Sequence, residues 1–122
     1  MQDRMYRGDA HLVEITVKRA GLPVDLTGAS IWYTAKAALA DADVDAVFQK
    51  TVGSGVTILD QVAYKGKAQL KLEAADTEGL DMGTAGFVVL YFDVQVKLLD
   101  ETSPWTVLLG TLKVERDVTI TD

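Results

Sequence analysis

The segment FVVLYFDVQVKLL, residues 87–99, alternates between two sets of side chains, and this alternation decides the fold class. Successive side chains of a β-strand point to opposite faces, so a period of two predicts a strand with one buried face. The side chains predicted to be buried are those of Val88, Leu90, Phe92, Val94, Val96 and Leu98. Asp93, Gln95 and Lys97 belong to the other face, which we expect to meet water.

The water-facing set of this strand begins with three apolar residues, Phe87, Val89 and Tyr91. If the strand forms a hairpin with the last strand, these side chains form an exposed patch of the kind that marks a protein interface. The other members of that patch would be Trp105, Val107 and Leu109. Two alternatives remain open: a loop at residues 37–46 folds over the patch, or a β-bulge turns residues 105–109 into the core.

The last strand, within residues 105–120, changes the parity of its apolar residues. Trp105, Val107 and Leu109 share one parity, and Leu112, Val114, Val118 and Ile120 share the other. Glycine at such a change indicates a β-bulge, because one extra residue reverses the facing of all residues that follow. We therefore predict a bulge at Gly110; a strand that is apolar on both faces is the alternative.

Short strand-like segments with the same alternation occur along the rest of the chain. They are residues 11–18, 30–37, 47–51, 56–59 and 67–73. About seven short strands with hardly any helix favour an immunoglobulin-like antiparallel β-sandwich, and a small β-barrel is the alternative. We expect one domain, residues 9–122, preceded by a flexible amino-terminal arm, residues 1–8.

One helical turn is expected within residues 74–83. It is predicted to start near Asp76 or Thr77, which are good cap residues, and to end at Gly79 or Gly83. The acidic, alanine-rich residues 37–46 are predicted to form a loop.

The composition limits the partners of the chain, which has 122 residues, a formal net charge of −6 and no cysteine. A negative surface repels phosphate, so we expect no nucleic-acid partner. Without cysteine, no disulfide or thiolate metal site can form. The longest apolar run, residues 87–92, is too short to cross a bilayer as a helix, so no membrane partner is expected.

Few residues are suited to catalysis. His11 is the single histidine of the chain, and the sequence shows no recognisable partner for it. The DADVDA segment, residues 41–46, has the acid spacing of a calcium loop, but Ala46 and Val52 replace the glycine and glutamate that such a loop needs. We therefore expect a protein that is not an enzyme, with no catalytic residue, no cofactor site and no metal site.

The segment LPVDLTGASI, residues 22–31, has a structural interpretation. Asp25 or Thr27 is placed to bond nearby backbone amides, and Gly28 is placed to turn the chain. Apolar Leu26 is expected to anchor the turn in the core. We therefore interpret this segment as a folding device and not as a binding site.

Four segments taken together carry a family resemblance: LPVDLTGASI at 22–31, ADT at 75–77, YFDVQV at 91–96 and LLGTLKVERDVT at 108–119. In this order and spacing they resemble small immunoglobulin-like structural proteins of tailed bacteriophages and prophages. That family includes the amino-terminal domain of baseplate upper proteins. The acidic stretch ALADADVDA, residues 38–46, is an insertion relative to the family.

The resemblance implies a non-enzymatic structural component of a phage or prophage particle, located in the tail, baseplate or neck. It implies contacts with other phage structural proteins, a homo-oligomer or multicopy ring, and a place in the virion after assembly in the bacterial cytoplasm. The residues expected at these contacts are Phe87, Val89, Tyr91, Trp105 and Val107, together with Met1–Arg7 of the arm.

A ligand-binding immunoglobulin-like module is the alternative function. Such a module could recognise carbohydrate through Trp32, Tyr33 or Trp105, because a sugar site needs aromatic side chains beside polar groups. The exposure of these three side chains in the folded chain separates the two functions.

Overall fold

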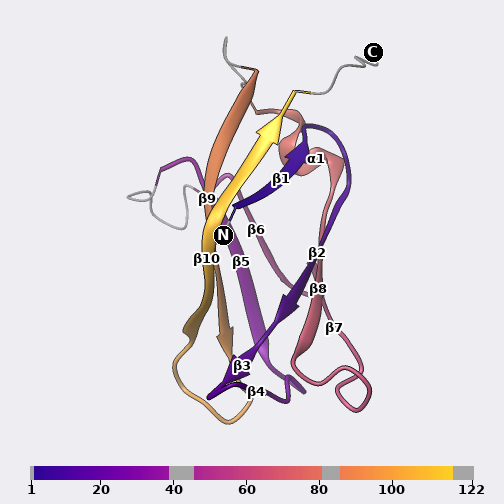
Figure 1. The fold of residues 1–122 in the computed structure, drawn as a ribbon, viewed down its shortest axis with the longest axis vertical. Coiled ribbons are helices and arrows are strands. Elements are labelled where there is room, and N and C mark those ends of the chain that lie inside the picture. Colours follow the sequence, from indigo (N-terminus) through magenta and orange to yellow (C-terminus); the bar gives the residue numbers. More distant parts are fainter. Residues whose placement is uncertain (1, 39–45, 81–85, 117–122) are drawn as a thin grey trace.

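The structure is a computed structural model and describes residues 2–38, 46–80 and 86–116. Nearly all regular structure in these residues is β (Figure 1). The elements are β1 (Gln2–Tyr6), β2 (His11–Thr16), β3 (Lys18–Arg19), β4 (Leu22–Pro23), β5 (Ser30–Lys36), β6 (Phe48–Val52), β7 (Gly55–Ile58), β8 (Lys67–Leu72), α1 (Ala74–Glu78), β9 (Phe87–Lys97) and β10 (Trp105–Glu115).

The described strands form one large sheet and one small hairpin. The large sheet has eight strands in the order β1–β10–β9–β5–β6–β7–β8–β2, and β3 pairs with β4. Two neighbouring pairs, β1–β10 and β6–β7, are parallel, and the other pairs are antiparallel. The sheet curls so that β10, β9 and β5 lie across the core from β2, β8 and β7 (Figure 1). The predicted all-β fold is confirmed, and this nearly closed sheet fits both a β-sandwich and a small barrel.

The core lies between the two parts of the sheet and confirms the predicted alternation. In β9, the buried side chains are Leu90, Phe92, Val94 and Val96. Their counterparts on other strands include Ile15, Ile31, Ala35, Ala68, Leu70 and Leu72. Tyr33 of β5 stacks on Phe92 and Phe48, with ring centroids 5.0 Å and 6.0 Å apart. Burial of these apolar side chains is the main source of stability in a fold of this kind.

The hydroxyl of Tyr33 is buried, and it has no hydrogen-bond partner among the described residues. Only 1% of this residue is exposed. Burial, and to a smaller extent the negative charge of Asp3, raises the pKa of Tyr33 above its ordinary value. A buried polar group without a partner lowers stability, because it has lost its bonds to water without replacing them.

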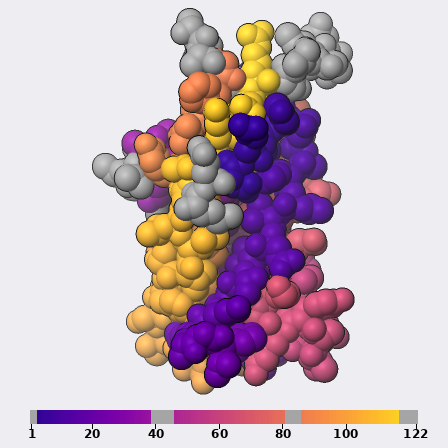
Figure 2. Space-filling view, in the orientation of Figure 1, coloured from indigo at the N-terminus to yellow at the C-terminus, as the bar shows by residue number. Residues whose placement is uncertain are grey.

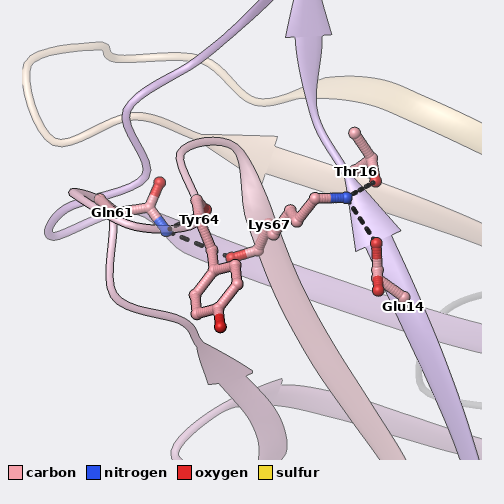
Figure 3. Close-up of polar contacts among 5 residues, drawn as sticks. All are labelled: Glu14, Thr16, Gln61, Tyr64 and Lys67. Carbon is pink, nitrogen blue, oxygen red and sulfur yellow. Dashed lines mark hydrogen bonds and ion pairs between the residues drawn. The ribbon is translucent and has the colours of Figure 1, made fainter.

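One glutamine joins two loops at the end of the fold. Gln61 Oε1 accepts hydrogen bonds from the backbone N–H groups of Leu26 and Gly66, each at 2.9 Å. Its Nε2 donates to the carbonyl oxygen of Leu59 at 2.7 Å. It also donates to the carbonyl oxygen of Lys67 at 3.2 Å (Figure 3). The side chain therefore fastens the loop after β4 to the turn between β7 and β8.

Gly66 completes this junction because of its backbone conformation. Its φ of +80° is one that side chains disfavour, and a Cβ there would lie 2.7 Å from the Val17 carbonyl oxygen. Next to it, the Lys67 ammonium pairs with Glu14 of β2 at 2.6 Å (Figure 3). Glycine therefore lets the β7–β8 turn approach the end of β2 closely.

The predicted turn bonds and core anchor of residues 22–31 are confirmed. Asp25 Oδ1 accepts hydrogen bonds from Thr27 N at 2.9 Å and Thr27 Oγ1 at 2.6 Å. These bonds hold the pKa of Asp25 below its ordinary value. Leu26, between the two, is fully buried and anchors the turn in the core.

The expectation of an amino-terminal arm outside the domain is corrected. Gln2–Tyr6 form β1, which pairs with β10 over Thr111–Glu115 and buries Met5 in the core. The turn that follows is tied to the helical segment, because Gly8 N donates to Thr77 Oγ1 at 2.9 Å. The sequence signal was weak because these few residues mix charged and polar side chains, and their partner strand is distant in the chain.

The predicted helical turn with Asp76 near its start and Gly79 at its end is confirmed, but the cap residue is Glu73. Helix α1 begins at Ala74 after the cap residue Glu73. Asp76 lies inside the first turn, where its Oδ2 accepts a hydrogen bond from Glu73 N at 2.7 Å. The aspartate therefore reaches back to the cap and does not act as the cap itself.

The predicted bulge at Gly110 was also misplaced. The register between β9 and β10 shifts between Thr106 and Leu108, and Gly110 stays in regular register opposite Phe92. Trp105 lies opposite Val96 and Leu108 opposite Val94, so β10 uses one more residue than β9 over this interval. Val107 is the extra residue of the bulge. Most of the predicted 37–46 loop, residues 39–45, lies outside the described residues.

We expect Gln61→Met to lower the free energy of unfolding by about 2–4 kcal/mol, because it leaves the N–H groups of Leu26 and Gly66 without their acceptor. Urea unfolding followed by circular dichroism measures the change. Gln69→Met is the matched control, since Gln69 is an exposed glutamine of β8. Equal stabilities of the two variants would contradict the role given to Gln61.

We expect Tyr33→Phe to raise the free energy of unfolding by about 1 kcal/mol, because it removes a buried hydroxyl that has no partner among the described residues. Tyr64→Phe, at an exposed tyrosine, is the control and should change stability by less than about 0.5 kcal/mol. A clear loss of stability in Tyr33→Phe would show that the hydroxyl has a stabilising partner.

Candidate interaction surface

The candidate surface is the side of β10, β9, β5 and β6 that points away from the core, here called the outer face. Its side chains alternate with the buried ones along each strand. On β9 they are Phe87, Val89, Tyr91, Asp93, Gln95 and Lys97. The strands of the outer face are hydrogen-bonded to their neighbours along most of their length. The backbone beneath these side chains is therefore held in place by the sheet.

An apolar strip occupies one part of the outer face. It consists of Phe87, Val89 and Tyr91 of β9 with Leu109 of β10. Leu109 is 65% exposed and Phe87 is 41% exposed, and the other two are half-buried. Leu109 is opposite Asp93 and Phe87 is opposite Glu115, so the two exposed side chains mark the two ends of the strip. A contiguous apolar strip on the surface of a sheet is typical of a binding surface.

Charged side chains border the apolar strip near Phe87. The Lys113 ammonium lies 4.5 Å from the centroid of the Phe87 ring, which is a cation–π contact. Glu115, opposite Phe87 in the β9–β10 register, pairs with Arg4 at 3.2 Å. An apolar centre beside a charged rim is the usual anatomy of a protein interface.

Trp105 and Val107 do not join this strip, although the sequence grouped them with it. The bulge at Val107 places Trp105 opposite Val96, on the inner side of the sheet. The Arg19 guanidinium lies 3.8 Å from the centroid of the Trp105 ring and pairs with Glu101 at 3.1 Å. Trp105 is therefore half-buried beneath an arginine, away from the outer face.

These two residues line a separate hollow of about 460 Å³, with Thr16, Lys18 and Thr106. Its lining comes from β10, the end of β2 and the start of β3. Figure 2 shows the orange and yellow atoms of the carboxy-terminal half of the chain beside the indigo and violet atoms of the amino-terminal segments. Of the five residues predicted at contacts, three therefore lie together on the outer face. The other two lie at this junction between the edges of the sheet.

A second, polar part of the outer face was missed by the sequence reasoning. A hollow of about 340 Å³ is lined by Trp32, Thr34, Gln49, Asp93, Gln95 and Pro104. A smaller hollow of about 100 Å³ adjoins it and shares Thr34 and Asp93. The sequence does show polar residues at alternate positions of residues 30–37 and 87–99. This alternation predicts two strands with a polar face, but it does not show that β5 and β9 are neighbours.

The described residues offer little for catalysis. His11 Nε2 lies 3.0 Å from Asp3 Oδ2, which joins β2 to β1. No group of three or more His, Cys, Asp or Glu side chains suited to a metal ion occurs in the part of the chain that the structure describes. The acidic residues 41–45, considered above as a calcium loop, lie outside that part. No helix among the described residues is long and apolar enough to span a membrane.

Comparison with known proteins adds no relative: no family model matches the chain, and no curated protein matches it.

Proposed function

We propose that this chain is a non-enzymatic structural component of a phage or prophage particle, in the tail, baseplate or neck, and that it acts through protein–protein contacts. The resemblance of residues 22–31, 75–77, 91–96 and 108–119 to such proteins supports the assignment. The observation that carries it is the apolar strip on β9 and β10, which exposes Leu109 and Phe87 on paired strands.

The strip suits a permanent contact for two physical reasons. Burial of an exposed leucine or phenylalanine contributes about 1.5–3 kcal/mol, which is enough to favour association when several such side chains act together. The strands that carry the strip are paired on both sides, β9 with β5 and β10, so little chain entropy is lost when a partner binds.

The partner in this proposal is another structural protein of the particle or a further copy of this chain in a ring. A ring repeats one contact many times, so each contact can be modest in strength while the assembly stays intact. Mixed charges at the rim, Lys113 and Glu115, suit a protein partner better than the uniformly negative surface of a nucleic acid.

Cryo-electron microscopy of purified particles tests the proposal, using the phage or induced prophage that encodes the chain. We expect density for repeated copies that contact their neighbours through the outer face. Absence of the chain from every purified particle would overturn the proposal.

A pair of leucine substitutions tests the strip itself. We expect Leu109→Asp to reduce incorporation into particles at least tenfold, because a charge would be buried at the contact. Leu12→Asp is the matched control: Leu12 is 60% exposed on β2 and Leu109 is 65% exposed on β10. Quantitative mass spectrometry of purified particles measures both. Equal incorporation of the two variants would contradict a role for the strip.

A further inference from the structure

Trp32 is the one aromatic side chain, of the three considered for carbohydrate, that lies on the outer face. Tyr33 is 1% exposed and stacks inside the core. Trp105 lies on the inner side of β10 beneath Arg19. Trp32, in contrast, is half-buried on β5 and lines the hollow of about 340 Å³.

The other walls of this hollow come from neighbouring elements. Thr34 is on the same strand as Trp32, Gln49 is on β6, and Asp93 and Gln95 are on β9. The pairing registers place Thr34 opposite Gln49 on one side and opposite Asp93 on the other. The polar groups therefore converge because of strand pairing and not because of their positions in the sequence.

These polar side chains hold one another in place. Gln49 Nε2 donates to Thr34 Oγ1 at 2.9 Å, and Gln95 Nε2 donates to Asp93 Oδ2 at 3.4 Å. Each bond uses one hydrogen of an amide that carries two, and neither bond uses the amide oxygen. The hollow thus presents amide donors and acceptors in fixed positions beside an indole ring.

The chemistry of the lining indicates a neutral ligand. Among the described lining residues, Asp93 carries the one charge, and Lys36 lines the adjoining smaller hollow. The described residues that line the larger hollow include no lysine or arginine, and a phosphate or sulfate would need such cations to hold it. A pyranose ring suits the site, because its C–H face packs on an aromatic ring while its hydroxyl groups bond to amides and carboxylates.

We infer that the hollow over Trp32 is a binding site for a neutral oligosaccharide built of pyranose units. The two hollows share Thr34 and Asp93, so the site extends along β5 and β9 towards Tyr91. Trp32 and Lys36, the residue paired with Tyr91, are four residues apart on β5, or about 13 Å along the strand. This length fits linked sugar rings better than a single one. The inference does not depend on the proposed place in a phage particle.

A glycan array probed with the full chain tests the inference, with cellotriose, maltotriose and the trimer of N-acetylglucosamine titrated separately by calorimetry. We expect binding to at least one neutral oligosaccharide. We also expect Trp32→Ala to weaken that binding at least tenfold. Absence of binding to every neutral glycan at millimolar concentration would overturn the inference, as would a preference for sulfated or phosphorylated glycans.

A second set of variants separates a loss of the binding site from a loss of the fold, in case Trp32→Ala does not fold. Gln49→Ala changes an exposed side chain of the site and should weaken binding at least threefold, and circular dichroism shows whether the variant is still folded at the temperature of the titration. Gln69→Ala, at an exposed glutamine of β8, is its matched control and should bind as the unmodified chain does. Trp105→Phe should also leave binding unchanged. Normal binding by Gln49→Ala and Trp32→Ala would place the sugar elsewhere and overturn the assignment of this hollow.

Discussion

The pairing of β9 on both sides is the constraint on which the rest of the structure depends. β9 is joined to β10 along Phe87–Val96 and to β5 along Tyr91–Lys97. A shift by one residue would exchange its two faces and would bury Asp93 and Gln95 in place of Phe92 and Val94. Burial of a carboxylate without partners costs several kcal/mol, so the register has one stable solution. Both parts of the outer face follow from that register.

Two local features, a β-bulge and the side chain of Gln61, determine the positions of Trp105, of Leu109 and of the loop before β5. The bulge at Val107 turns Trp105 inward, where Arg19 covers it, and leaves Leu109 outward beside Asp93 in the β9–β10 register. Gln61 ties the loop after β4 to the turn before β8, so the loop that leads into β5 has a fixed position.

The outer face combines two kinds of surface that meet at the middle of β9. Phe87, Val89 and Tyr91 follow one another along β9, and Leu109 lies opposite Asp93, next to Tyr91. Asp93 and Gln95 line the larger hollow with Trp32. An apolar strip suits a dry and lasting contact, whereas amides beside an indole suit a hydrated ligand that exchanges. The two proposed roles therefore use different ends of one sheet face, because the outward side chains of β9 change from apolar to polar along the strand.

The sequence by itself determined the β class, the buried face of most strands and the turn bonds of residues 22–31. These depend on period-two alternation and on side-chain bonds within a few residues, such as Asp25 to Thr27, which are local properties. Phe87, Val89 and Tyr91 were recognisable as a group for the same reason, because they share one strand. The cap residue of α1 was missed because Asp76 reaches back to Glu73 from inside the first turn.

Only the tertiary structure decided which strands are neighbours, and with that the composition of the candidate sites. β1 belongs to the sheet through a parallel partner more than one hundred residues away in the chain, and the alternation of Gln2–Tyr6 is too short to reveal it. The bulge lies at Val107 because Trp105 and Leu108 both face the core. Their partners on β9, Val96 and Val94, are consecutive core-facing residues two positions apart, so β10 needs one extra residue between them. Thr34, Gln49 and Asp93 meet because β5 pairs with β6 and β9. Such pairings depend on burial summed over the whole sheet, which no single segment of the sequence contains.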